Sequence, residues 1–263
     1  MNMHKARKRF GQNFLQDTHV IHQIIMAISP HESEHLVEIG PGQGAITEPL
    51  LASACQLDII ELDRDLVTQL GKQFSTQQRF TLHSADALTF DYASLVQTNK
   101  IRIVGNLPYN ISTPLLFHLL SFTDHIQDMH FMLQKEIVNR LQAQPGSKQY
   151  GRLSIMIQLH CHVEALFDVD PESFDPKPKV MSSIVRLTPH RNQKFQINDI
   201  PFFEKLVTTA FSQRRKTIRN SLKKMCSDTE LEKAGIDPNQ RAESIHISEF
   251  VTLNNQLVNN RVD

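Results

Sequence analysis

The stretch "VEIGPGQGAIT", residues 37–47, decides the fold, because a glycine-rich turn there follows a β-branched run and opens a helical pattern. Gly40, Gly42 and Gly44 let the backbone turn tightly and approach a ligand closely. Further on, "IIELD" (59–63) places Glu61 at the end of the next β-branched run, where a carboxylate can accept both hydroxyls of a ribose. The glycines alone would equally suit a plain strand–helix turn, whereas the two signals together favour a nucleoside site.

Around this turn, short β-branched runs alternate with helical patterns from residue 35 to residue 134. The expected strands are "HLVEI" (35–39), "QLDII" (56–60), "RFTLH" (79–83), "IRIVG" (101–105) and "MHFML" (129–133). The expected helices cover about 45–53, 64–74 and 113–121. This alternation predicts right-handed βαβ units and an α/β fold with a parallel sheet between helices. Two later runs with period two, "CHVEALFDV" (161–169) and "SSIVRLTP" (182–189), predict an antiparallel addition at one edge.

Beyond about residue 190 the strand pattern stops, which predicts a small C-terminal all-α domain at 190–263 after an α/β domain at 1–189. The stretch "FEKLVTTAFSQRRKTIRNSLKKM" (203–225) repeats apolar residues at helical spacing and is expected to form one helix with a basic opposite side. Residues 176–224 hold twelve Lys or Arg against two acids, whereas residues 10–175 hold nine against 19. Such a block suggests an anionic partner, although a solvated helix face would carry the same charge.

The composition is that of a soluble globular protein from a reducing compartment, with 40% apolar and 21% charged residues. Cys55, Cys161 and Cys226 form no CxxC pair, which argues against a zinc cluster or a disulfide framework. No apolar run approaches the ~20 residues that a membrane helix needs. The basic start "MNMHKARKRF" lacks the apolar stretch of a secretory signal, and a mitochondrial transit peptide is the alternative for it.

The glycine spacing discriminates between nucleoside ligands. The dinucleotide fingerprint is GxGxxG with a pyrophosphate at the helix N-terminus, whereas this chain has GxGxG with Glu38 two residues before Gly40. That pattern resembles the glycine loop of S-adenosylmethionine-dependent methyltransferases. Asp86, in "SADAL" after the third predicted strand, can accept the adenine amino group and would serve equally well as a helix N-cap.

The stretch "GNLPYNIS" (105–112) narrows the resemblance. Its Asn-Leu-Pro-Tyr resembles the motif of methyltransferases that act on exocyclic amines, and its surroundings are similar to ribosomal RNA adenine N6-dimethyltransferases. Further matches are "RKRFGQNFL" (7–15), "IELDRDL" (60–66), "FMLQKEIVNR" (131–140), "YGRLS" (150–154), "FDPKPKV" (174–180) and "FSQRRKTIRNSL" (211–222). Together these motifs resemble the bacterial small-subunit (16S) ribosomal RNA adenine N6,N6-dimethyltransferases of the KsgA/RsmA type.

This resemblance implies a Rossmann-like class I methyltransferase sheet that uses S-adenosyl-L-methionine as its cofactor. It implies transfer of methyl groups to N6 of two adjacent adenosines near the 3′ end of small-subunit ribosomal RNA, with a role in ribosome biogenesis. The expected partner is that RNA or an assembling 30S particle, without a membrane, and the protein is expected to be a cytoplasmic monomer. Residues 1–189 would then bind the cofactor, with 1–30 as a basic arm and covering segment, and 190–263 would bind RNA.

The resemblance also assigns site residues. The cofactor residues would be Asn13, Leu15, Gly40, Glu61, Asp86 and Asn106. The catalytic set would be Asn106, Leu107, Pro108, Tyr109 and Phe174. In it, the Asn106 Oδ1 and the Leu107 carbonyl would accept the two amine N–H groups, with no competing N–H from Pro108. Tyr109 would stack on the adenine, and Phe174 would cover the other face of the base or, equally, lie buried beneath the edge hairpin.

RNA contacts are expected from a set of basic residues, and no metal is expected. The set comprises Lys5, Arg7, Lys8, Arg9, Lys177, Lys179, Arg214, Arg215, Lys216, Arg219, Lys223 and Lys224. Lys177 departs from the double proline common in relatives. His83, His118 and His130 are expected in strands or a helix without a chemical role. Three alternatives are a large-subunit adenine dimethyltransferase, a DNA adenine methyltransferase, which would have proline at position 107, and a non-catalytic RNA-binding assembly factor.

Overall fold

The computed structural model describes residues 12–192, 194–213 and 215–260. The predicted RNA contacts at positions 5, 7, 8, 9 and 214 lie outside these described residues. The chain divides into two compact units, one of Met1–Val138 with His162–Pro189 and one of Asn139–Cys161 with His190–Asp263. One passage between the units falls between Pro189 and His190. In addition, the segment 139–161, which was expected in the first domain, belongs to the second unit.

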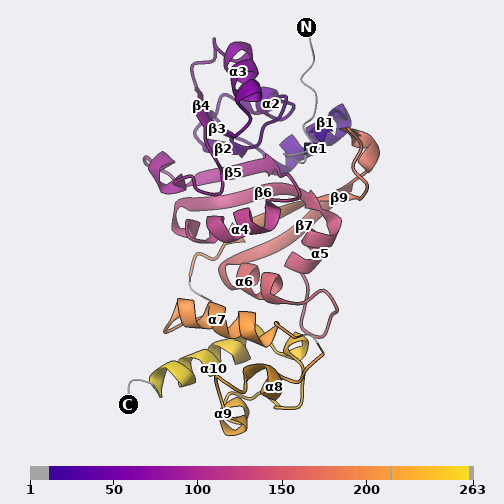
Figure 1. Ribbon diagram of the computed structural model, residues 1–263. Coiled ribbons are helices and arrows are strands. Elements are labelled where there is room, and N and C mark those ends of the chain that lie inside the picture. Colours follow the sequence, from indigo (N-terminus) through magenta and orange to yellow (C-terminus); the bar gives the residue numbers. More distant parts are fainter. Residues whose placement is uncertain (1–11, 193, 214, 261–263) are drawn as a thin grey trace. The chain divides into compact units, whose positions relative to one another are not determined.

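The described residues form a seven-stranded sheet in the order β4-β3-β2-β5-β6-β9-β7 (Figure 1). Its strands are β2 (His35–Ile39), β3 (Gln56–Glu61), β4 (Phe80–Ser84), β5 (Ile101–Asn106), β6 (Ile126–Gln134), β7 (Cys161–Val169) and β9 (Ser182–Pro189). Strands β2 to β6 pair in parallel and β9 pairs antiparallel with β6, which confirms the predicted α/β fold with its antiparallel addition. The strand order reverses between β2 and β5, the position at which open α/β sheets bind their ligands.

The helices over residues 47–52, 64–73 and 112–120 lie at the predicted places, whereas those over 18–28 and 135–141 were not predicted. In the first unit the helices are α1 (Thr18–Ile28), α2 (Thr47–Ala52), α3 (Arg64–Gln73) and α4 (Ser112–Leu120), and α5 (Lys135–Leu141) spans the passage into the second unit. Asp17 and Asp63 start α1 and α3, because their carboxylates accept backbone N–H groups of the first turn. A short antiparallel pair of β1 (Phe14–Leu15) and β8 (Phe174–Asp175), which the sequence pattern does not predict, anchors the segment before α1.

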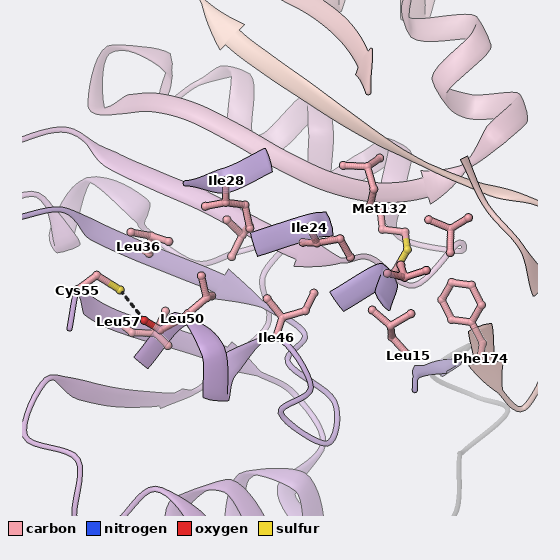
Figure 2. Close-up of a cluster of buried hydrophobic side chains, with 14 residues drawn as sticks. Leu15, Ile24, Ile28, Leu36, Ile46, Leu50, Cys55, Leu57, Met132 and Phe174 are labelled. Carbon is pink, nitrogen blue, oxygen red and sulfur yellow. Dashed lines mark hydrogen bonds between the residues drawn. The ribbon is translucent and has the colours of Figure 1, made fainter. Parts of the chain in front are cut away.

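A buried apolar cluster joins α1 to the sheet (Figure 2). Ile24 and Ile28 of α1 pack in this cluster with Leu36 of β2 and Met132 of β6. The Cys55 thiol is part of it, and burial raises its pKa. Cys55 and Cys161 are buried as expected of core residues, whereas Cys226 is half-buried.

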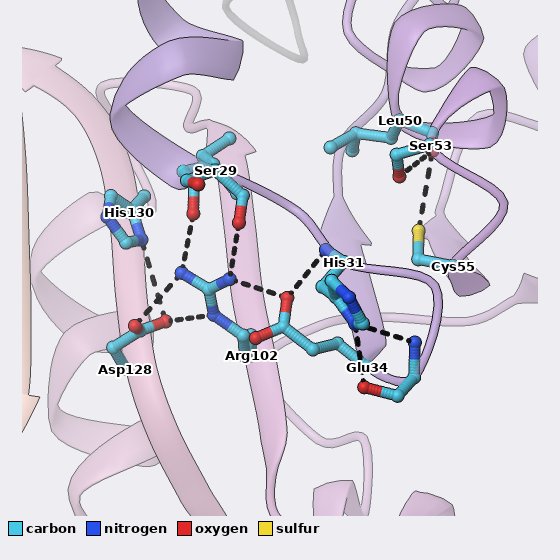
Figure 3. Close-up of polar contacts among 11 residues, drawn as sticks. Ser29, His31, Glu34, Leu50, Ser53, Cys55, Arg102, Asp128 and His130 are labelled. Atoms are coloured by element: carbon cyan, nitrogen blue, oxygen red, sulfur yellow. Dashed lines mark hydrogen bonds and ion pairs between the residues drawn. The ribbon is translucent and has the colours of Figure 1, made fainter.

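A buried ion-pair network at the C-terminal end of α1 ties this helix to β5 (Figure 3). The Arg102 guanidinium donates to the Ile28 carbonyl at 2.7 Å and pairs with Glu34 at 2.7 Å and Asp128 at 2.9 Å. A buried guanidinium is tolerated only when it is paired, and the last carbonyls of a helix are a favourable place for a cation. The end of α1 is thereby held against β5 and β6.

His35, His83 and His118 have structural partners in the first unit. His35 and His83 both form hydrogen bonds to the buried Asp58 carboxylate at 2.5 Å, across β2, β3 and β4. His118 of α4 forms a hydrogen bond to the Phe90 carbonyl at 2.9 Å. All three therefore serve the fold of the first unit.

The second unit contains α6 (Arg152–His160), α7 (Ile200–Ala210), α8 (Ile218–Leu222), α9 (Asp228–Lys233) and α10 (Ile247–Asn259) among its described residues. The single helix expected over 203–225 is wrong, because α7 ends at Ala210 and α8 begins only at Ile218. The first N–H groups of α8 donate to the Gln240 and Pro238 carbonyls, in place of the carbonyls that a continuous helix would offer. No helix in the described part of the chain is long and apolar enough to cross a membrane.

Candidate active site

A cavity of about 320 Å³ opens in the first unit where the strand order reverses. It lies at the carboxyl ends of β2, β3 and β5, and the loop after β4 completes its lining. The predicted site residues that line it are Asn13, Leu15, Gly40, Glu61, Asp86, Asn106, Leu107, Pro108 and Tyr109. The tertiary structure therefore brings the glycine loop and the Asn-Leu-Pro-Tyr motif into one cavity.

The glycine loop lines this cavity, and Gly40, Gly42 and Gly44 all have positive φ angles. Gly40 and Gly42 have φ angles of +64° and +60°, which residues other than glycine rarely adopt. A Cβ at Gly42 would come within 3.0 Å of the Phe14 ring, and the Gly40 N–H donates to the Ile60 carbonyl at 3.0 Å. The loop is thus locked to the end of β3, with β1 packed closely over it.

Two buried carboxylates face the cavity from neighbouring strands. Glu61 ends β3, is 8% exposed, and accepts a hydrogen bond from the Asp63 N–H at 2.8 Å. Burial raises the pKa of Glu61. Glu38 in β2 is 1% exposed and accepts from the Thr47 hydroxyl at 2.6 Å. Burial, with a smaller contribution from the Glu61 charge, raises the pKa of Glu38 to about 7.

Asp86 lies in the loop after β4, at the start of a turn. Its carboxylate accepts a hydrogen bond from the Leu88 N–H at 2.9 Å and so caps the turn of residues 87–89; because no helix begins there, the expected helix N-cap is wrong. The same residue is half-buried and lines the cavity. A capping role and a ligand-binding role are compatible here, since a carboxylate accepts several hydrogen bonds.

Asn106 stands at the end of β5 with a defined amide orientation. Its Nδ2 donates to the Asn13 carbonyl at 3.1 Å, which leaves Oδ1 as the acceptor of the amide. The preceding Gly105 is required by close packing, because a Cβ there would lie 2.6 Å from the Ile39 carbonyl oxygen. Asn106 is therefore held between the glycine loop and the segment before α1.

The next three residues turn the chain from β5 into α4. The Leu107 N–H donates to the Met132 carbonyl at 3.2 Å, which continues the pairing with β6. The Pro108 carbonyl accepts from the Ile111 N–H at 3.1 Å and from the Ser112 hydroxyl at 3.0 Å. The turn is thus rigid on both sides of the proline.

Tyr109 lines the cavity and is anchored at its hydroxyl. The hydroxyl forms a hydrogen bond with the Ser182 Oγ at 2.9 Å, and burial raises the pKa of Tyr109. Ser182 is the first residue of β9 and is buried. The sequence pattern marks Ser182 only as the start of a strand, so its contact with Tyr109 was not foreseeable.

Phe174 lies elsewhere. It is 6% exposed and packs in the core cluster, paired through β8 with Leu15 of β1 (Figure 2). It is not among the residues that line the cavity. The structure thus places Phe174 where the alternative interpretation expected it, as a core residue, because the β1–β8 pair turns its ring inward.

The predicted RNA contacts in the described residues lie on the surfaces of both units. In the first unit Lys177 forms an ion pair with Glu172, and Lys179 is exposed. In the second unit Arg219 pairs with Asp228 at 2.8 Å. Arg215 and Lys216 are exposed in the connection between α7 and α8 rather than on a helix face. Lys223 and Lys224 follow α8 and are also exposed.

Known proteins similar to this chain agree with one another. The family model for ribosomal RNA adenine dimethylase matches residues 3–259. The Pseudomonas aeruginosa protein named ribosomal RNA small subunit methyltransferase A is 56% identical over 97% of this chain and 95% of its own length. The protein of the same name from Hydrogenovibrio crunogenus is 55% identical, with 97% of each chain covered.

Solved structures show the same similarity in three dimensions. A dimethyladenosine transferase from Plasmodium falciparum superposes with a TM-score of 0.80 at 25% identity, covering 94% of this chain and 98% of that one. The 23S rRNA methyltransferase ErmE has a TM-score of 0.71 at 24% identity, over 94% of this chain and 100% of that one, and shows the shared fold. Because the family model and the relatives span nearly the whole sequence, the chain belongs to the ribosomal RNA adenine dimethylase family of methyltransferases.

Proposed function

We propose that this chain transfers methyl groups from S-adenosylmethionine to N6 of two adjacent adenosines near the 3′ end of small-subunit ribosomal RNA, giving N6,N6-dimethyladenosines. The observation that carries the proposal is that Glu61 and Asp86, the expected nucleoside ligands, line the same cavity as Asn106 and Tyr109. The small-subunit RNA is favoured because the relatives with more than half of their residues identical bear that name.

The cavity fits S-adenosylmethionine in volume and in its hydrogen-bonding groups. Its volume of about 320 Å³ is within the range of roughly 300–1,000 Å³ for small-molecule sites. Glu61 would accept the ribose hydroxyls and Asp86 the adenine amino group, while Gly40 lets the backbone approach the ligand. When bound, S-adenosylmethionine supplies a methyl group already activated on a sulfonium.

The protein's own contribution is position and polarity. The N6 lone pair of adenine is delocalised into the ring, so the free amine is a poor nucleophile. The Asn106 Oδ1 and the Leu107 carbonyl would accept its two N–H groups and offset the positive charge that grows on nitrogen. Pro108 brings no N–H that competes for these acceptors. No catalytic base is needed, because the proton leaves readily once nitrogen is an ammonium.

Tyr109 would hold the target base outside its stack. Extruding a base costs a few kcal/mol, and stacking on an aromatic ring returns roughly 1–3 kcal/mol. The hydrogen bond from Tyr109 to Ser182 limits rotation of the ring before the base arrives. Alignment of the amine with the methyl group then follows from the rigid turn that carries Asn106 and Tyr109.

Exposed cations of the two units would bind RNA phosphates. Lys177 and Lys179 would do so in the first unit, and Arg215, Lys216, Arg219, Lys223 and Lys224 in the second. Phosphate contacts position RNA without reading its sequence. We further propose that the chain acts as a cytoplasmic monomer on this RNA or on an assembling 30S particle.

The test offers radiolabelled S-adenosylmethionine with naked small-subunit RNA, small-subunit particles, large-subunit RNA and duplex DNA, followed by nucleoside analysis. Dimethyladenosine in either small-subunit substrate supports the proposal, and its appearance only in large-subunit RNA overturns it. Asn106→Ala should abolish transfer, while Asn99→Ala, an exposed change before β5, should not. Normal turnover by Asn106→Ala would refute the role given to this amide.

A further inference from the structure

The charge of the cavity lining is one-sided. Glu38, Glu61 and Asp86 contribute three carboxylates. Among the described residues that line the cavity, none is a lysine, an arginine or a histidine. A cavity of this kind has no positive charge of its own to balance the carboxylates, so it favours a ligand that brings one.

Glu38 is the most deeply buried of the three carboxylates, so an uncompensated negative charge costs most there. Its side chain is more deeply buried than that of Glu61, and Thr47 of α2 provides a neutral hydroxyl donor rather than a cation. The neighbouring strand β3 adds the negative charge of Glu61, and β5 on the other side presents uncharged residues at Val104 and Asn106. An ionised carboxylate in such surroundings is unfavourable until a cation arrives.

Methyl transfer changes the charge in the cavity by one unit. The bond between sulfur and the methyl carbon breaks and its electron pair stays on sulfur, while a new bond forms between that carbon and N6. The sulfonium thereby becomes an uncharged thioether, and the methylated amine loses one proton to solvent. The two ligands, S-adenosylmethionine and S-adenosylhomocysteine, therefore differ by one positive charge within nearly the same shape.

We propose that Glu38 is the residue by which the cavity distinguishes the sulfonium methyl donor from the thioether product. The inference rests on the proposed function and adds a specificity-determining residue to it. Ionised Glu38 stabilises the donor complex, and it loses its counter-charge when the methyl group leaves. Spent cofactor is thereby bound less favourably than it would be in a neutral cavity, which assists its exchange for a second donor before the second methylation.

The raised pKa of Glu38 supports this role in distinguishing the two ligands. Because burial raises the pKa of Glu38 to about 7, the empty site is partly protonated at neutral pH. Binding of the cation favours the ionised form and displaces that proton, whereas binding of the thioether displaces less of it. Donor binding to the wild-type protein should thus release more protons at pH 7 than thioether binding does.

The test compares calorimetric affinities for donor and thioether in the wild type, Glu38→Gln and Asp86→Asn. Glutamine keeps an acceptor for the Thr47 hydroxyl, so the fold around it is preserved. We expect Glu38→Gln to lower the ratio of donor affinity to thioether affinity about tenfold or more, a change of about 1.4 kcal/mol. Asp86→Asn, the matched control, should weaken both ligands by similar factors.

A second measurement uses the unmodified protein and does not depend on any variant. Titrations at pH 7 in two buffers of different ionisation enthalpy give the protons released by each ligand. More release with the donor supports the inference; equal release by the two ligands, or an unchanged affinity ratio in Glu38→Gln, overturns it. If neither ligand binds the wild type, the proposed function fails and this inference fails with it.

Discussion

Glu38→Gln should make the stability of the protein less dependent on pH. The folded state raises the pKa of Glu38 from 4.5 to about 7. Between these two values the native protein holds a proton that the unfolded chain has released. The free energy of unfolding therefore falls as the pH rises through this window, and the loss is complete above the folded pKa. Glutamine does not titrate, so the variant escapes this loss.

The size of the effect follows from the same shift. Each pKa unit corresponds to about 1.4 kcal/mol, so a rise from 4.5 to about 7 is worth about 3 kcal/mol. The side chain is fully buried, and solvent screening does not reduce this figure. At about pH 8 the variant should therefore be more stable than the wild type by about 3 kcal/mol relative to their difference at about pH 4.5.

Urea unfolding of the cofactor-free protein at several pH values measures this difference. The chain contains no tryptophan, so circular dichroism is the suitable signal. Glu48→Gln is the matched control, because Glu48 is exposed in the first turn of α2 beside Thr47. Its pH dependence should stay within about 0.5 kcal/mol of the wild type. A pH profile of Glu38→Gln that parallels the wild type would show that Glu38 is ionised in the empty cavity, contrary to our reasoning.

Three further predictions concern the base-binding residues and the RNA contacts. Tyr109→Phe keeps the ring and loses the hydrogen bond to Ser182. The activation free energy that corresponds to kcat/KM for methyl transfer should therefore rise by about 0.5–1.5 kcal/mol. Tyr109→Ala should cost roughly 1–3 kcal/mol more, and equal effects would exclude stacking. Phe174→Ala should destabilise the fold by about 3–5 kcal/mol in urea unfolding, whereas Phe174→Leu should retain transfer. Loss of transfer in a well-folded Phe174→Leu variant would instead support the predicted contact between Phe174 and the base. Replacing three exposed cations with glutamine should weaken RNA binding and reduce its salt slope by about 2–3, with S-adenosylmethionine affinity unchanged. These cations are Arg215, Lys216 and Arg219.

Local patterns were sufficient for the frame of the first unit. Alternating β-branched and helical stretches predicted strands β2 to β6 within a few residues, because each pattern reports which side of its own element is buried. The glycine spacing and Glu61 predicted where a nucleoside would bind, since strands that pair in parallel bring their carboxyl ends to one edge. The Asn-Leu-Pro-Tyr turn then followed at the same edge.

The periodicity of the basic region was misleading for an identifiable reason. Apolar residues recur through Phe211 and resume at Ile218, so a helix of that register is compatible with both ends. Carbonyls of Gln240 and Pro238, more than fifteen positions away in sequence, take the first N–H groups of α8 and make a separate helix favourable. Such a distant acceptor leaves no mark on the local pattern.

By itself, the sequence determined the α/β sheet and the glycine turn and predicted which residues would bind an amine, because these depend on neighbours along the chain. Only the tertiary structure decided which side chains meet. It placed Phe174 in the core and Tyr109 against Ser182, 73 positions away, and it buried Glu38 near Glu61. Burial and long-range contacts set the energy of a polar group, and they arise only when distant segments pack together.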